Sequence, residues 1–178
     1  ICPTSYGDSP YQSFSTFAGN PYFIDFELLV GQGFLQKKDY ENISWGSDET
    51  QVDYGNLYVQ RHNLFAKIQK NFEKNIPSAF YDFCRDNSFW LEDYSLFMAI
   101  KDAHNGDSFS KWEADIIRRE PEALKNWSEK CKDRVNYYRI LQYLFYTQWN
   151  NLKKYANDNG IKIIGDIPIY VALTSADA

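Results

Sequence analysis

Apolar side chains recur every three, four or seven positions through the middle of the chain, which is the spacing of one face of an α-helix. The first stripe consists of Leu57, Leu64, Phe65, Ile68 and Phe72. Asp53 precedes this stripe and suits an N-cap, because its carboxylate can accept hydrogen bonds from the free N–H groups of a first helical turn. The pattern therefore predicts a helix that begins near Asp53.

Two shorter helices are predicted next. Pro77 fits the first turn of one of them, since its missing N–H has no partner there in any case. That helix carries Phe80, Phe83 and Cys84. The other is marked by Trp90, Tyr94, Phe97, Met98 and Lys101. Glu92 and Asp93 are expected near its start, where the helix dipole favours acidic side chains.

A longer helix is predicted from Pro121 onward. Its stripe consists of Leu124, Trp127, Cys131, Val135, Tyr138, Leu141, Phe145, Trp149 and Leu152. The pair Asn159-Gly160 is a strong stop signal, because both residues tolerate the left-handed conformation that closes many helices. For each stripe, packing in a core explains the pattern better than a cofactor site does.

Two segments favour strands. Residues 22–26 form a short apolar run between turn signals, within a region of irregular loop that extends to about residue 50. Residues 161–172 form a nearly continuous apolar run after the glycine stop, which is typical of a buried parallel strand. A helix followed by a buried strand is half of a βαβ unit. The sequence thus predicts an α/β protein whose own chain is mostly α with few strands.

Composition narrows the class of protein. The net charge of -5 argues against a nucleic-acid binder, which normally carries a basic stripe. No apolar run reaches the ~20 residues that a membrane span needs. The three cysteines lie far apart, which fits a reducing cytosol and argues against a zinc site or a disulfide scaffold. Neither His62 nor His104 has partner ligands at metal spacing, and glycine-rich phosphate loops are absent.

Aromatic residues make up 18% of the chain, and this excess has two interpretations. The simpler one is a core built from large rings. The alternative is that some rings are platforms for sugars, because a pyranose can lay its C–H face on a flat ring while nearby polar groups bond its hydroxyls.

Two places carry candidate chemistry. Asp166 interrupts an apolar run, and a buried carboxylate costs several kcal/mol unless it is paired or faces a cavity. It could belong to a site at the end of a barrel strand, or it could cap the next loop. Residues 5–13 combine hydroxyls, an amide, a carboxylate and two rings, which suits a sugar subsite. The alternative there is a turn whose side chains bond its own backbone.

Four runs, in order along the chain, resemble signatures of the amylomaltases, which are also called disproportionating enzymes. They are residues 5–22, 52–55, 90–101 and 163–172. The resemblance covers essentially the whole chain, whereas the chain covers a part of the family's protein. It implies a segment of a (β/α)8 TIM barrel. Residues 1–51 would be a glucan-contacting loop region, 52–150 a mainly helical insertion, and 151–178 a helix end and a barrel strand.

The resemblance implies transfer of α-1,4-glucan segments between maltodextrins in the cytoplasm, without metal or organic cofactor. Such a retaining reaction uses an Asp nucleophile and a Glu that acts as acid and then as base. The partners would be malto-oligosaccharides or glucans derived from starch or glycogen. Nucleic acid and membrane are not expected partners.

The resemblance also assigns residues. Tyr6, Ser9 and Tyr11 match positions that line glucan subsites, and Tyr6 also matches a second glucan-binding surface. Asp166 matches a carboxylate that supports the active-site base. None of the family's three catalytic carboxylate motifs occurs among the 178 residues, and Thr174 stands where the family usually has Asp. We therefore expect no catalytic residue within the chain and no activity from the chain by itself.

One alternative comes from a different class of protein. The helical majority and the aromatic excess would also suit a non-catalytic helical module that binds glucan or a protein partner. Quenching of tryptophan fluorescence by malto-oligosaccharide would favour sugar binding. Self-association without a response to sugar would favour a protein-interaction module.

Overall fold

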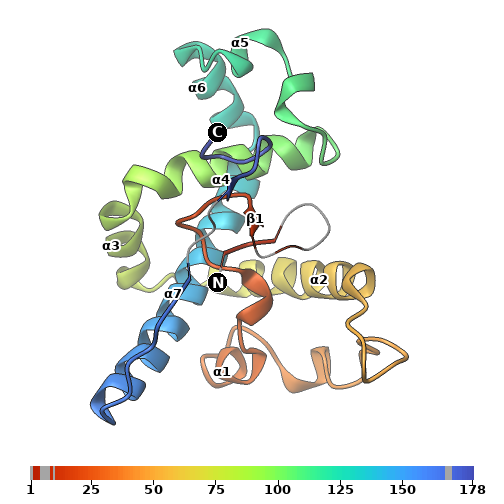
Figure 1. Ribbon diagram of the computed structural model, residues 1–178, viewed down its shortest axis with the longest axis vertical. Helices are drawn as coiled ribbons and strands as arrows, with labels where there is room; N and C mark the ends of the chain where they lie inside the picture. The colour runs from red at the N-terminus through yellow and green to blue at the C-terminus, as the bar shows by residue number, and fades with distance from the viewer. Residues whose placement is uncertain (1, 5–8, 10, 167–169) are drawn as a thin grey trace.

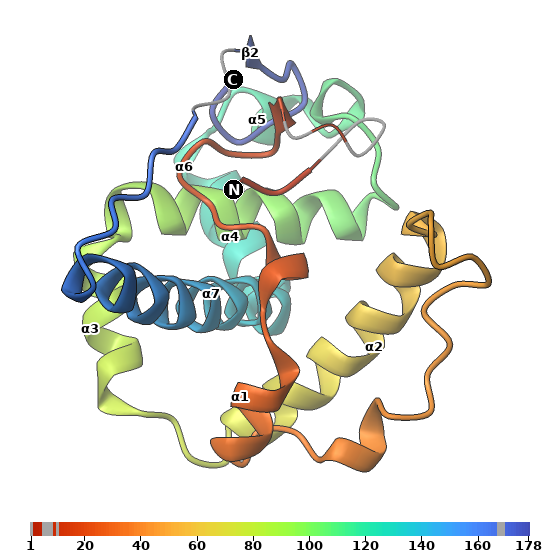
Figure 2. The ribbon, with the colours of Figure 1, turned by 60° about the horizontal axis from the view of Figure 1, so that its bottom comes forward.

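A long helix, α7 (Lys132–Asp158), runs through the centre of the molecule in the computed structural model, which describes residues 2–4, 9, 11–166 and 170–178 (Figure 1). Helices α2 (Tyr54–Phe72), α3 (Ser78–Asp86) and α4 (Ser88–Ala103) all pack against it. Figure 2 shows α4 above α7, with α2 and α3 on opposite sides. The prediction of a mostly helical chain is confirmed.

Local capping explains where the first helices begin. The Oδ1 atom of Asp53 accepts a hydrogen bond from the Asn56 amide at 2.9 Å, as an N-cap should. Pro77 immediately precedes α3. The third predicted helix begins earlier than expected, at Ser88, so Glu92 and Asp93 lie beyond its first turn. The expected stabilisation of these two acidic residues by the helix dipole was therefore wrong.

The long apolar stripe from residue 124 to 152 belongs to two helices. Helix α6 (Pro121–Lys130) ends at Lys130, and α7 begins at Lys132, so that Cys131 alone separates them. The apolar spacing continues across this break, so the sequence pattern did not reveal that two helices meet there. The end of α7 is as predicted. Gly160 has φ +74°, its amide bonds the carbonyl of Asn157 at 2.9 Å, and the Ile161 amide bonds the carbonyl of Ala156 at 2.9 Å.

The predicted strand at residues 22–26 was wrong. A 3₁₀ turn, η2 (Pro21–Phe23), and a short helix, α1 (Phe26–Gly31), occupy this segment. Asn20 caps the turn through the Tyr22 amide, and Asp25 caps α1 through the amides of its first turn. These two caps outweigh the β-propensity of the aromatic residues between them. The remaining short elements are η3 (Lys37–Asp39), η4 (Phe109–Lys111) and α5 (Ala114–Ile117).

The predicted buried strand at residues 161–172 is only partly present. Residues 161–166 have no regular secondary structure and are exposed, with Ile164 94% exposed. A strand becomes buried only when neighbouring elements cover it, and none of the elements in the described residues does so. Strand β2 (Tyr170–Val171) pairs in parallel with β1 (Gln12–Ser13), so that Gln12 lies opposite Tyr170.

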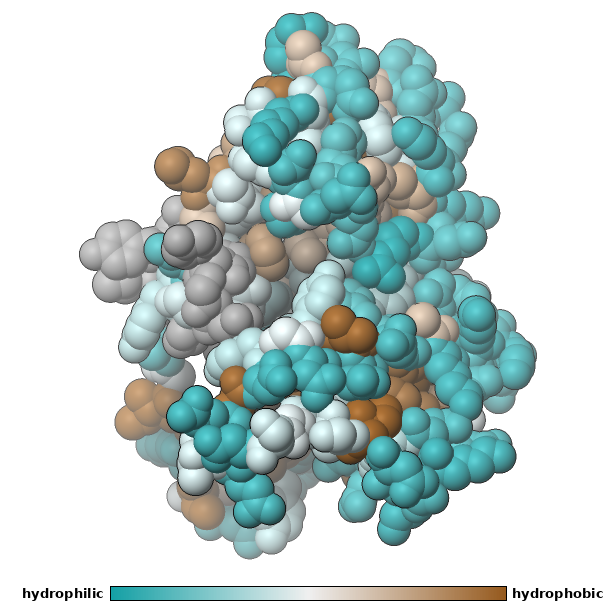
Figure 3. Space-filling view, turned by 90° about the vertical axis from the view of Figure 1, so that its right-hand side faces the viewer, coloured by the Kyte–Doolittle hydropathy of each residue, from teal (hydrophilic) through white to brown (hydrophobic). Residues whose placement is uncertain are grey.

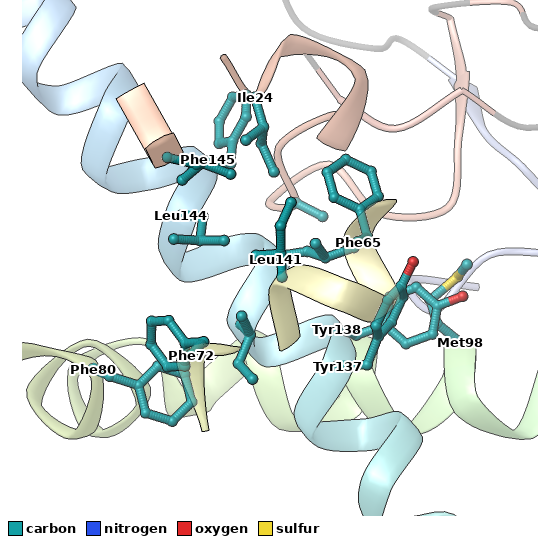
Figure 4. Close-up of a cluster of buried hydrophobic side chains, with 14 of the residues drawn as sticks. Ile24, Phe65, Phe72, Phe80, Met98, Tyr137, Tyr138, Leu141, Leu144 and Phe145 are labelled. Carbon is teal, nitrogen blue, oxygen red and sulfur yellow. The ribbon is translucent and has the colours of Figure 1, made fainter. Parts of the chain in front are cut away.

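Most of the aromatic rings pack in the interior, as the simpler interpretation of the aromatic excess requires. The main hydrophobic cluster lies where α2, α3, α4 and the loop before α1 meet α7 (Figure 4). Phe72 is fully buried there and contacts the rings of Phe34, Phe80 and Tyr143. The molecular surface seen in Figure 3 is mostly hydrophilic, with scattered apolar residues.

A smaller cluster joins α4 to α5 and α6. It consists of Ile100, Trp112, Ile116 and Ala123. His104, just after α4, lies against the rings of Trp112 and Trp127 and bonds the Glu113 carboxylate at 3.0 Å. This region is the upper part of Figure 1. None of the helices in the described part of the chain is both long enough and apolar enough to cross a bilayer.

Candidate functional site

The β1–β2 pairing brings the segment that follows Ser9 and Tyr11 beside the segment that follows Asp166. Gln12, which lies opposite Tyr170, is the residue directly after Tyr11. Thr4 forms an isolated antiparallel bridge with Ser13 on the same short strand. Two of the runs with candidate chemistry therefore meet at one small sheet, although more than 150 residues separate them.

The site residues expected near the N-terminus fall in different places. Tyr6 lies outside the described residues. The hydroxyl of Ser9 accepts a hydrogen bond from the Tyr11 amide at 3.3 Å, which agrees with the alternative of a turn that bonds its own backbone. Tyr11 is 52% exposed, so that its ring is available to a ligand. Both the self-bonded turn and an accessible ring are thus present in this segment.

Asp166 is exposed in the structure, so the expectation that it would be a buried carboxylate was wrong. Its neighbours Ile163 and Ile164 are exposed as well, at 43% and 94%. The error follows from the strand prediction, because an apolar run was assumed to have covering layers on both faces.

A second connection joins the two ends of the chain, and the sequence analysis missed it. The Asp177 carboxylate accepts hydrogen bonds from the amide of Thr16 at 2.7 Å and from its hydroxyl at 2.9 Å. The amide of Ala176 donates to the carbonyl of Phe14 at 2.8 Å. No periodicity links residues 161 positions apart, so only the supply of hydroxyls in residues 13–16 could have suggested it.

Polar side chains of α7 and α2 hold residues 17–25, the loop that leads from β1 to α1. Gln142 bonds the amide and the carbonyl of Gly19, and Gln148 bonds the amide and the carbonyl of Asp25. From α2, Arg61 donates to the carbonyls of Pro21 and Ile24. Burial lowers the pKa of Arg61 to about 10, so that it remains a cation at neutral pH.

A cavity of about 280 Å³ lies between this loop, α2, α4 and α7. Its walls combine rings with ionisable groups, including Tyr22, Tyr58, His62, Lys101, Asp102 and Tyr138. Pro3 and Thr4 also line it, directly before the run that contains Tyr6. Tyr137 and Tyr138 of α7 line it as well, and Figure 4 shows them beside Met98, which is another lining residue. Rings beside polar groups are typical of small-molecule sites.

Hydrogen bonds fix the polar wall of this cavity. Asp102 accepts from the Tyr138 hydroxyl at 2.8 Å and from the guanidinium of Arg134. The hydroxyl of Tyr137 is 2.8 Å from Nδ1 of His62. Burial, and then the charge of Arg134, lower the pKa of His62. Its imidazole is therefore neutral at neutral pH and can accept a hydrogen bond from the Tyr137 hydroxyl.

Burial also raises the pKa of Tyr58, Tyr137 and Tyr138, and Asp102 raises each of them further. All three phenols therefore keep their protons at neutral pH, and the hydroxyls of Tyr137 and Tyr138 bond His62 and Asp102. Sequence reasoning considered His62 only as a metal ligand. The pairing of Tyr58 and His62 one helical turn apart was the available signal for this wall. In the described ranges, no group of three His, Cys, Asp or Glu side chains is arranged to hold a metal.

Comparison with known proteins gives one consistent result. A family model described as 4-alpha-glucanotransferase matches residues 1–178. A 4-alpha-glucanotransferase of Clostridium butyricum is 47% identical over 174 residues, which are 98% of this chain and 36% of that protein. One of Thermus thermophilus is 42% identical over 179 residues and is covered to 35%. The chain thus spans about a third of the length of these curated relatives.

A solved structure agrees with these relatives. It is titled amylomaltase from Streptococcus agalactiae in complex with acarbose, and it is 46% identical to this chain with a TM-score of 0.94. The superposition covers 99% of this chain and 36% of that one. The helices, the short sheet and the loops between them therefore have the arrangement of one segment of that protein.

Proposed function

The chain belongs to the 4-alpha-glucanotransferase family, and on this basis we propose that it serves the transfer of α-1,4-glucan segments between maltodextrins. The observation that carries the proposal is the match of the family model to residues 1–178, together with a solved amylomaltase complex of the same fold. That complex contains acarbose, which supports an oligosaccharide ligand here too. The family match disfavours a helical module of unrelated function.

In this proposal the 178 residues supply part of the glucan site, and the segment belongs to a (β/α)8 barrel. Ser9 and Tyr11 contact the sugar, and Tyr6 contributes to a second glucan surface. The exposed ring of Tyr11 supports a stacking role, because a flat ring can cover the C–H face of a pyranose. The cavity beside Pro3 and Thr4 is a candidate extension of the Tyr6 surface, since it combines rings and hydroxyls.

The chemistry in this proposal is a retaining double displacement. A carboxylate attacks the anomeric carbon, a second carboxylic acid protonates the leaving oxygen, and the acceptor sugar then resolves the covalent intermediate. Asp166 supports the active-site base in this scheme, and its exposure leaves it accessible to other groups. We place the nucleophile and the acid/base outside residues 1–178.

The test has a binding arm and an activity arm. We expect the purified chain to bind maltoheptaose in calorimetry, and Tyr11→Ala to weaken that binding. The matched control is Tyr155→Ala, because Tyr155 is 70% exposed and lies near the C-terminal end of α7. Absence of binding by the wild-type chain would overturn the glucan-contacting role. Glucose and longer maltodextrins from maltotriose would overturn the placement of the catalytic carboxylates.

A further inference from the structure

The side chain of Gln142 is fully buried, and both of its polar atoms are used by one residue of the loop. Its Oε1 accepts from the Gly19 amide at 2.7 Å, and its Nε2 donates to the Gly19 carbonyl at 2.9 Å. A buried amide that lost either partner would keep an unsatisfied polar atom, which is costly. Both hydrogen bonds can therefore form only when the Gly19 backbone is in one position.

The close approach at Gly19 makes this placement stricter. A Cβ atom built on Gly19 would lie 1.9 Å from Cδ1 of Phe145, so the backbone rests directly on the ring. Gln142 and Phe145 are neighbours on α7, three residues apart. One side chain thus fixes the hydrogen-bonding groups of Gly19, and the other fixes its distance from the helix.

Two further residues of α7 also form hydrogen bonds with the backbone of this loop. The Tyr146 hydroxyl donates to the carbonyl of Phe17. Gln148 bonds the amide of Asp25 at 2.8 Å and its carbonyl at 3.0 Å. The helix therefore holds the loop backbone at three points, of which Gly19 is the most deeply buried.

The loop transmits this placement toward Tyr11 through short local bonds. The Phe17 amide donates to the Ser15 hydroxyl at 3.2 Å, and the Ser13 hydroxyl donates to the Ser15 carbonyl at 2.7 Å. Ser13 and Ser15 are both buried. Ser13 ends β1, which begins at the residue after Tyr11. A shift at Gly19 would therefore move a hydrogen-bonded run that reaches Ser13, two residues after Tyr11.

We propose that Gln142 is a positioning residue for glucan binding, which it serves by fixing the loop of residues 17–25 and, through it, the preceding segment that carries Ser9 and Tyr11. This inference rests on the proposed function, because it assumes that these two residues contact the sugar. Gln142 itself does not touch the ligand in this proposal. The order of the loop and the affinity for sugar are separate quantities, so each can be measured by itself.

The experiment compares four variants of the full chain with the wild type. Gln142→Leu removes both hydrogen bonds at similar volume. Gln142→Glu keeps both bonds while its carboxyl is protonated, and loses the donor when it ionises. Gln69→Leu is the matched control, since Gln69 is a half-buried glutamine on α2 whose side chain bonds Glu73 and the carbonyl of Asp133 and not the loop. Ile116→Ala destabilises the separate cluster around Trp112 without contact with the loop. Amide hydrogen exchange reads the order of the loop, and calorimetry with maltoheptaose reads affinity.

We expect Gln142→Leu to speed exchange of the Gly19 and Tyr11 amides and to weaken maltoheptaose binding by about tenfold or more, because buried polar groups lose their partners. In Gln142→Glu, affinity should fall as pH rises, whereas the wild type stays flat over the same range. Ile116→Ala should lower stability and leave both readouts unchanged.

Several results would overturn the inference. One such result is a folded Gln142→Leu variant whose amide exchange and affinity for maltoheptaose equal those of the wild type. Ile116→Ala could weaken binding as much as Gln142→Leu does, which would reduce Gln142 to a general contribution to stability. If Gln142→Leu does not fold, a flat pH profile of Gln142→Glu would overturn it. Absence of sugar binding by the wild type would instead overturn the proposed function, and the exchange data would still report on the loop.

Discussion

Asp177 and Thr16 are 161 positions apart in the sequence, and the carboxylate of one accepts two hydrogen bonds from the other, at 2.7 and 2.9 Å. Bonds of this kind to a charged acceptor are stronger than those between neutral groups. We expect Asp177→Ala to release the Thr16 amide, so that its hydrogen exchange becomes faster. Asp177→Asn keeps an acceptor oxygen and is the control. Equal exchange of the Thr16 amide in both variants would show that the Asp177–Thr16 pair does not hold the segment around Thr16.

Gly19→Ala should be strongly destabilising, because the new methyl group would lie 1.9 Å from the Phe145 ring. We expect a loss of about 3 kcal/mol in the free energy of unfolding, at the upper end for overpacked sites. The control is Gly31→Ala, since nothing lies within 4 Å of a Cβ at Gly31 and it ends helix α1. Urea unfolding measures both. A Gly19→Ala variant as stable as the control would contradict the close contact.

Phe72→Ala should cost about 3–5 kcal/mol of stability, as is usual for a large buried ring. Phe72 is the last residue of α2, is fully buried, and contacts the rings of Phe80 on α3 and Tyr143 on α7. Leu152→Ala is the comparison, because Leu152 is 56% exposed and should cost less than about 0.5 kcal/mol. Thermal or urea unfolding of the two variants would rank them. Similar losses would mean that the main cluster is not centred on Phe72.

His62 should make stability fall as the solution becomes acidic. Burial and Arg134 lower its pKa in the folded chain, whereas the unfolded chain keeps the ordinary value of about 6.5. The unfolded chain therefore binds the proton first. Stability is complete above the unfolded pKa, and it is lost as pH falls from there to the folded pKa.

This pH dependence can be isolated because the chain has two histidines. In proton NMR, the His62 ring should titrate with a midpoint below the ordinary value. His62→Gln can still accept a hydrogen bond from the Tyr137 hydroxyl but does not titrate, so its unfolding free energy should vary less with pH below about 7. His104→Gln is the control and should keep the slope due to His62. Equal slopes in the wild type and His62→Gln would contradict the role of His62.

The sequence predicted the helices well, because their signals are local. The stripe from Leu57 to Phe72, the cap at Asp53 and the stop at Gly160 depend on residues a few positions apart. The errors occurred where competing local signals had to be weighed. Asn20 and Asp25 each cap a helical turn, and these caps prevailed over the β-propensity of the residues between them.

The candidate site could be predicted only in part. Residue types suggested Ser9 and Tyr11, and the exposed ring of Tyr11 fits that suggestion. Asp166 was expected to be buried, because an apolar run does not reveal whether other elements cover it. The contacts of Gln142 with Gly19 and of Asp177 with Thr16 join distant residues, and polar pairs at such separations leave no periodic pattern in a single sequence.

The contact between Gln142 and Gly19 also affects the order in which the molecule can form. A ribosome makes Gly19 first and Gln142 only 123 residues later. Until α7 has emerged, the backbone of Gly19 lacks the Gln142 side chain that bonds it, while α2, α3 and α4 already have local helical bonds. Contacts between distant residues slow folding, since the chain must be closed before they contribute. During synthesis, the loop that contains Gly19 would therefore become fully ordered later than α2, α3 and α4, although it is translated before them.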